Sequence, residues 1–210
     1  MKSLSFLVIL LFATSCHIPQ PKSLDQNTEE APITDIDKPL AHAFSALDGS
    51  WAGQFHIYEH TEGQAYQVTI PQQLTHDFLS NLSLKETGFI EVHQEYRSKT
   101  PYYQTVSITD TYQENGVPKE VKSTGVNKIQ NGQIWCVVQK PTEKIVHLGS
   151  IPEKDVIIWQ GHSADPFRKE YFYETVLADT YEIVGYGYYG QDDPAKNPKM
   201  WFWGKYERVF

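Results

Sequence analysis

The chain has 210 residues, of which 40% are hydrophobic and 21% charged, so it carries enough apolar side chains to fold around a core. Its net charge is −8, with no basic stripe, which argues against a nucleic-acid backbone as its partner. Aromatic residues make up 13%, and this richness favours β-strands over helices. Cys16 and Cys136 lack the spacing of a metal-binding pair, and we expect neither a metal nor a cofactor.

Residues 1–15 predict an export signal, because Lys2 precedes an apolar run that is too short to span a bilayer. The segment Ala13-Thr14-Ser15-Cys16 resembles the lipobox of bacterial lipoproteins, although alanine stands at the position where leucine is usual. The resemblance implies that Cys16 carries lipid and anchors the protein to a bacterial membrane, facing the periplasm or the outside. The alternative is an ordinary secretory signal that leaves Cys16 as a free thiol.

Residues 16–38 are rich in proline and acidic side chains and show no sustained apolar period, which predicts a flexible tether. Residues 39–210 then form one predicted domain. It begins with a short helix over residues 39–47, where Leu40, Phe44 and Leu47 share one face.

From Trp51 onward the apolar period changes from helical spacing to alternation, which is typical of half-buried strands. Asn-Gly pairs at 115–116 and 131–132 predict tight hairpin turns. Residues 72–84 fit either a helix or an irregular strand. The predicted strands cover residues 51–58, 66–70, 89–97, 102–112, 121–129, 133–140, 144–149, 155–161, 167–176, 180–189 and 200–209.

These segments predict an all-β fold, an up-and-down antiparallel barrel of about 8–11 strands. A two-sheet sandwich is the alternative, but consecutive hairpins with short turns favour the barrel.

Gly49-Ser50-Trp51 resembles the Gly-x-Trp motif that opens the first barrel strand of lipocalins and other calycins. The resemblance implies that Trp51 closes one end of the barrel and that an arginine from a late strand lies across its ring, for which Arg208 is the candidate. Nitrobindin-like haem barrels share this opening, but they carry a haem-ligating histidine near the C-terminus. No histidine follows His162 here, so we expect no haem.

The aromatic strands near the C-terminus hold the candidate ligand-binding residues, which are Tyr171, Tyr173, Tyr186 and Tyr188. Gly185 and Gly187 alternate with the last two and would leave room for a ligand or ease a bend. A packed aromatic core is the alternative.

For the other polar groups we expect structural roles and not catalysis or metal binding. A solvated strand face is expected for Glu91, His93, Glu95 and Arg97. Cys136 is expected to be a buried, inert thiol. His56 and His60 lie too far apart along a strand to share a metal, and His162 with Asp165 makes too few ligands.

Together these features predict a membrane-tethered protein of the cell envelope that binds a small apolar or amphipathic ligand. One alternative is a barrel enzyme acting on a bound small molecule, which requires a titratable group pointing inward. The other is a filled barrel that serves as a protein-interaction module.

Overall fold

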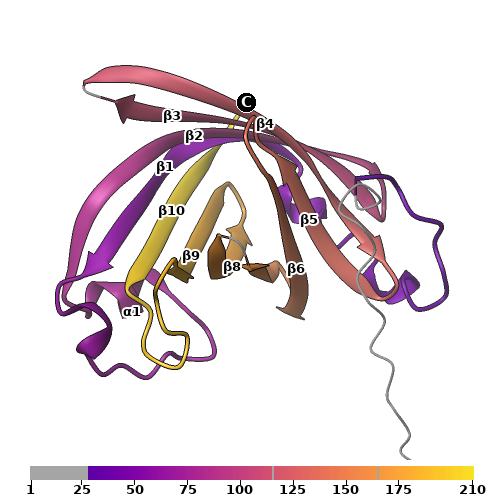
Figure 1. Ribbon diagram of the computed structural model, residues 1–210. Helices are drawn as coiled ribbons and strands as arrows, with labels where there is room; N and C mark the ends of the chain where they lie inside the picture. The colour runs from indigo at the N-terminus through magenta and orange to yellow at the C-terminus, as the bar shows by residue number, and fades with distance from the viewer. Residues whose placement is uncertain (1–27, 115, 165) are drawn as a thin grey trace, which may run out of the picture.

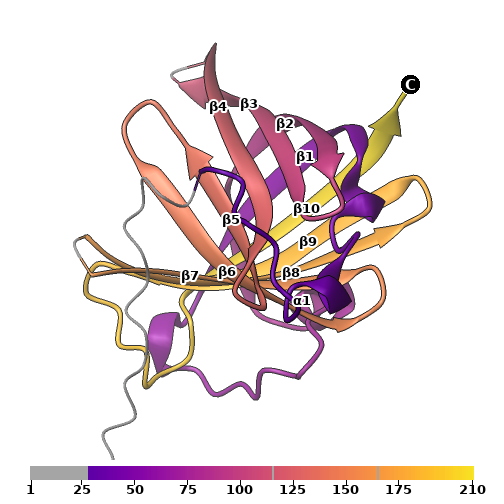
Figure 2. The same cartoon turned by 90° about the vertical axis from the view of Figure 1, so that its right-hand side faces the viewer.

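A computed structural model describes residues 28–114, 116–164 and 166–210. Within them, ten antiparallel strands form one closed barrel in which each strand pairs with its neighbours in sequence and β1 closes on β10. The strands wrap around a single interior (Figures 1 and 2). The strands are β1 (Gly49–His60), β2 (Leu84–Thr100), β3 (Tyr103–Glu114), β4 (Val117–Gln130), β5 (Gln133–Gln139), β6 (Lys144–Glu153), β7 (Val156–Ala164), β8 (Phe167–Leu177), β9 (Thr180–Tyr189) and β10 (Met200–Val209).

The predicted fold class is confirmed: the chain is an all-β, up-and-down antiparallel barrel. Short turns join most neighbouring strands, and the Asn-Gly pair at 131–132 adopts positive φ at both residues (56° and 70°), as a tight hairpin requires. Closing the sheet leaves no edge strand with unpaired backbone groups, so the barrel removes the need for a covering layer.

Two segments differ from the sequence-based expectation, and residues 72–84 contain a helix, which is one of the two alternatives expected there. Residues 66–70 are not a strand, since they belong to a long connection between β1 and β2. That connection also contains the short helix α1 (His76–Ser80), whose N-terminus is capped by the Thr75 hydroxyl accepting from the Phe78 N–H. Residues 39–47 form two separate 3₁₀ turns, η2 (Lys38–Leu40) and η3 (Ser45–Leu47), rather than one helix.

One end of the barrel is sealed by the segment that precedes β1. Phe44 and Leu47 are buried there together with Trp51, which is fully buried. The Trp51 indole N–H donates to the Leu47 carbonyl at 2.7 Å, so its polar atom is satisfied inside the plug. The hairpins β2–β3, β4–β5, β6–β7 and β8–β9 turn at this sealed end, and the other hairpins turn at the opposite end, which we call the mouth.

The chain contacts the barrel before residue 39. The buried carboxylate of Asp37 accepts hydrogen bonds from the backbone N–H groups of Thr34 and Gly132, at 2.8 and 2.7 Å. Tyr103 donates to the Thr28 carbonyl at 2.9 Å. Residues 28–38, which the sequence places in the tether, therefore contact the barrel through the Asp37 carboxylate and the Thr28 carbonyl.

A second apolar cluster lies outside the barrel. The β1–β2 connection, with α1, covers the outer face of β9 and β10, and its Tyr66, Leu74 and Leu79 are buried against the fully buried Trp201. The indole N–H of Trp201 donates to the Tyr66 hydroxyl at 2.9 Å. No helix within the described residues is both long and apolar enough to cross a membrane.

Candidate functional site

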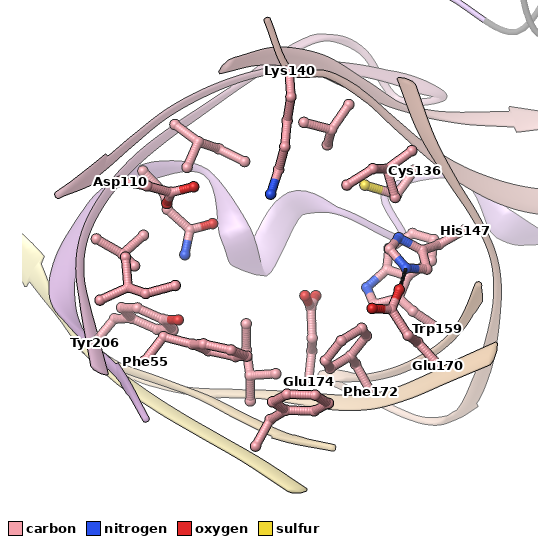
Figure 3. Close-up of a pocket in the computed structure, with 18 of the residues that line it drawn as sticks. Phe55, Asp110, Cys136, Lys140, His147, Trp159, Glu170, Phe172, Glu174 and Tyr206 are labelled. Carbon is pink, nitrogen blue, oxygen red and sulfur yellow. Dashed lines mark hydrogen bonds and ion pairs between the residues drawn. The ribbon is translucent and has the colours of Figure 1, made fainter. Parts of the chain in front are cut away.

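The barrel interior contains a cavity of about 280 Å³ between the sealed end and the mouth. Alternation along each strand sends every second side chain into it. Figure 3 shows the cavity with charged and aromatic side chains converging on it from all sides. Its apolar lining comes from Phe55, Ile90, Val92, Ile108, Val138, Ile145, Trp159, Phe172, Ile183 and Phe202, and its polar lining from Gln94, Tyr96, Asp110, Tyr112, Cys136, Lys140, His147, Glu170, Glu174, Tyr181, Tyr189 and Tyr206.

Glu174 is the central acidic group near the sealed end. Its carboxylate accepts from the Tyr181 hydroxyl at 2.8 Å and from the indole N–H of Trp159. Burial raises the pKa of Glu174, and these two hydrogen bonds together with the charge of His147 offset only part of that effect. The cavity therefore favours the neutral acid at this position.

Three further polar residues, Gln94, Tyr96 and Tyr206, accompany Glu174 at this depth. The Tyr96 hydroxyl donates to the Gln94 side-chain carbonyl at 2.5 Å. Tyr206, only 1% exposed, lines the same part of the cavity. Within the described part of the chain, the Tyr206 hydroxyl and the Gln94 amide nitrogen have no hydrogen-bond partner. Both can serve a ligand without losing an existing contact.

An acid–histidine cluster lies at mid-height on β6 and β8. His147 Nε2 is 3.3 Å from Glu170 Oε2, and the Tyr189 hydroxyl donates to Glu170 Oε1 at 2.6 Å. Arg168 adds an ion pair to Glu170 at 3.6 Å. His147 and Glu170 meet over Gly161 of β7, where an added Cβ would lie 2.6 Å from His147 Nε2. The absence of a side chain at Gly161 is what allows these two groups to touch.

The electrostatics of Glu170 are opposite to those of Glu174. Burial acts to raise the Glu170 pKa, but hydrogen bonds from His147 and Tyr189 and the charges of His147 and Arg168 outweigh it, so the pKa lies below its usual value. Glu170 is thus held as a carboxylate that orients the His147 ring. An oriented imidazole beside a cavity has the geometry of a general acid or base.

Cys136 lies directly opposite His147 across the β5–β6 ladder and also faces the cavity. Burial, reinforced by the charge of Glu174, raises the pKa of the Cys136 thiol far above its usual value. It remains a thiol rather than a thiolate, in keeping with the expected inert character, although it borders the cavity instead of a solid core.

The mouth carries one ammonium and one carboxyl. Lys140 extends into the cavity from just beyond β5, and Asp110 lies on another wall (Figure 3). Burial raises the pKa of Asp110, while the charge of Lys140 and a hydrogen bond from Tyr112 act in the opposite direction. Lys140 forms no ion pair with a described residue.

Trp51 and Arg208 are in contact at the sealed end. The Arg208 guanidinium carbon lies 4.2 Å from the centre of the Trp51 ring, a cation–π contact worth roughly 0.5–2 kcal/mol. Arg208 also donates to the Asp48 carbonyl at 2.6 Å and pairs with Asp179 at 3.2 Å. The pair closes the end of the barrel away from the mouth and does not line the cavity.

The four tyrosines expected to bind ligand lie on the outer face of β8 and β9. Tyr171 and Tyr186 stack on each other with ring centres 4.9 Å apart, and Tyr173 and Tyr186 pack against the outer cluster around Trp201. The Tyr188 hydroxyl donates to the Lys196 carbonyl at 3.1 Å. None of the four is among the residues lining the cavity, because the strand register turns the neighbouring residues inward.

The remaining candidate groups are dispersed. Glu91, His93 and Arg97 are exposed on the outer face of β2, which confirms a solvated strand face. His56 stacks on Trp203 at 5.4 Å between ring centres, whereas His60 is buried against Tyr66. Asp165, the suggested partner of His162, falls outside the described residues. No group of three or more metal-ligating side chains is clustered in the described part of the chain.

Comparisons with known proteins identify no relative by sequence, since no protein-family model and no curated protein matches the chain. Two similar solved structures are described as EF1p2_mFAP2b bound to DFHBI and as a redesigned β barrel, b11L5F_LGL. The first has 8% sequence identity and a TM-score of 0.38 and covers 80% of this chain and 98% of its own. The second has 11% identity and a TM-score of 0.37 and covers 81% and 98%. Likeness at this level carries no inference about function.

The fold and the cavity therefore define a class, a ten-stranded β-barrel with a partly polar interior cavity. In this chain the described cavity lining includes three carboxyl groups and one lysine. These groups were not among the predicted site residues, although alternation carries the signal: Glu170 and Glu174 share a face with Phe172, and Lys140 continues the face of Cys136 and Val138.

Proposed function

We propose that this protein binds a small, mainly apolar ligand with polar substituents inside the barrel. The observation that supports the proposal is the cavity itself, with apolar walls and a few convergent polar groups, as is usual for small-molecule sites. Its volume of about 280 Å³ lies near the lower end for such sites, which favours a compact ligand. A barrel that acts only as an interaction module has no need for an interior cavity.

The experiment is a fluorescence titration with N-phenyl-1-naphthylamine, a neutral apolar probe. We expect saturable binding to the wild-type protein and loss of binding in Val138→Phe, which fills the cavity from β5. Leu148→Phe is the matched control, because Leu148 is 40% exposed on β6 and does not line the cavity. Equal binding by all three proteins would place the probe outside the barrel and contradict the proposal.

The proposal extends to location and family. A lipidated Cys16 would hold the barrel at a bacterial envelope membrane, and the Trp51–Arg208 contact supports kinship with the lipocalin-like calycins. Cys16 lies outside the described residues, so its support is the lipobox-like sequence alone. Cys16→Ser is expected to abolish palmitate labelling and membrane partition, and a variant that retains both would exclude lipidation at this residue.

A second candidate function is acid–base catalysis on the bound molecule. It is favoured by one observation, the hydrogen bond that orients the His147 ring from Glu170 at the cavity wall. Any turnover detected with a bound compound should fall at least about 100-fold in His147→Gln, in line with the usual contribution of a general base. Turnover that is unchanged in this variant would exclude the role.

A further inference from the structure

The polar groups of the cavity are divided between its two ends. Cys136, His147 and Glu170 lie at one level, linked by the β5–β6 pairing and the His147–Glu170 contact. Lys140 lies four residues from Cys136 toward the mouth, and Glu174 lies four residues from Glu170 toward the sealed end. Figure 3 shows Lys140 and Glu174 pointing into the cavity from opposite walls. A ligand that reaches both must carry a polar group at each end.

The mouth is suited to an anion. Lys140 supplies a positive charge without an ion-pair partner among the described residues. Asp110 lies on another wall of the mouth, and burial raises the pKa of its carboxyl group, so it opposes an anion less than an exposed carboxylate would. The sealed end is less suited to one, because Glu174 repels a ligand carboxylate once it loses its proton, and no described residue lining that end supplies a cation to compensate. The acidic group of the ligand therefore belongs beside Lys140.

The sealed end is suited to a hydroxyl group. Glu174 and the nearly buried hydroxyl of Tyr206 both face the cavity, and the amide nitrogen of Gln94 offers an unused donor. A hydroxyl group both donates and accepts one proton, so it can pair with Glu174 in either protonation state while accepting from Tyr206 or Gln94. A ligand ammonium could only donate, and Lys140 would oppose its entry through the mouth.

Between the two ends the wall is aromatic. The rings of Phe55, Phe172 and Phe202 lie 5.7–6.5 Å apart, in tilted and stacked arrangements. These rings come from β1, β8 and β10 and form one side of the cavity, where they favour a flat ligand ring in offset or edge contact. We propose that the ligand is a small aromatic carboxylic acid bearing a hydroxyl group, bound with its carboxylate beside Lys140 and its hydroxyl between Tyr206 and Glu174. This inference rests on the proposed function and names the chemistry of its ligand.

The test is displacement of N-phenyl-1-naphthylamine by three probes: 4-hydroxycinnamic acid, cinnamic acid, which lacks the hydroxyl, and methyl 4-hydroxycinnamate, which lacks the charge. We expect the hydroxy acid to bind about 3- to 10-fold more tightly than either analogue, the factor for one hydrogen bond or one partly exposed ion pair. Equal affinity for all three, or tighter binding of the cation tyramine, would overturn the inference while leaving the proposed function intact.

Two variants test which end of the cavity binds the carboxylate of the ligand and which end binds its hydroxyl group. Lys140→Met should remove the preference for acid over ester, and Tyr206→Phe should remove the preference for the hydroxylated acid. Neither side chain forms a hydrogen bond or an ion pair with a described residue, so both variants should fold. Lys205→Met and Tyr186→Phe, on outer faces, are matched controls that should keep both preferences. Preferences that persist in the cavity variants would overturn the assignment, and absence of probe binding to the wild type would overturn the proposed function as well.

Discussion

Strand β8 carries different chemistry on its two faces. Inward-facing positions hold Glu170, Phe172 and Glu174, which border the cavity. The intervening outward positions hold Tyr171 and Tyr173, which pack on other aromatic rings or on the outer cluster. Adjacent residues on one strand therefore serve different purposes, one face forming the candidate site and the other stabilising the barrel from outside.

This contrast shows that an abundance of aromatic residues does not locate a site. The outer tyrosines pack on other aromatic rings, and the Tyr188 hydroxyl already donates to the Lys196 carbonyl. Burial shifts the pKa values of titratable groups inside the barrel, and these groups border the cavity in which a ligand would bind. The two faces can be separated by variants that act on stability without binding, or on binding without a large loss of stability.

The largest effect is expected from Trp201→Ala on the outer face. Trp201 is fully buried in the outer cluster, so its removal should lower the free energy of unfolding by about 3–5 kcal/mol. The affinity for N-phenyl-1-naphthylamine should be unchanged. Phe172→Ala on the inner face should cost only about 1–3 kcal/mol, because its ring already borders a cavity, but it should alter the probe affinity several-fold. Urea denaturation measures the change in stability and probe titration measures the change in affinity. If both variants changed the probe affinity by the same factor, the proposed difference between the two faces would be contradicted.

A smaller effect separates two acids on the inner face. The pKa of Glu174 is raised by burial, so in the wild type the folded state becomes less stable as the pH rises above the unfolded value of about 4.5. Glu174→Gln removes this cost, and its stability relative to the wild type should increase between pH 4 and pH 8. Glu170 has a lowered pKa and acts in the opposite sense, stabilising the fold above its pKa and losing that contribution as the pH falls. Urea midpoints at pH 4, 6 and 8 measure the difference, and a variant that parallels the wild type would contradict the raised pKa.

The smallest effect is expected from Tyr171→Phe on the outer face. The ring stack with Tyr186 is kept, and only a hydroxyl without a hydrogen bond in the described structure is lost. Stability should change by less than about 0.5 kcal/mol, and probe affinity should not change. A several-fold loss of probe affinity in this variant would indicate that the outer tyrosines take part in ligand binding.

The fold was predictable because alternation, hairpin turns and aromatic content all favour the same architecture. The site was harder to predict, because alternation defines two faces without saying which one is inside. The Gly-x-Trp resemblance indicated that Trp51 lies at the sealed end. No motif indicated whether Tyr186 or Glu174 faces the inside of the barrel. The contact of His147 with Glu170 depends on the order β6, β7, β8 and on the missing side chain of Gly161, which only the closed sheet brings together.

The most direct test of the central claim is methyl NMR of isoleucine-labelled protein during titration with N-phenyl-1-naphthylamine. Ile145 and Ile183 line the cavity, whereas Ile158 lies on β7 and does not. We predict saturable shifts of the Ile145 and Ile183 methyl signals, with the Ile158 signal unchanged. Shifts confined to Ile158, or uniform small shifts of all three, would contradict binding inside the barrel.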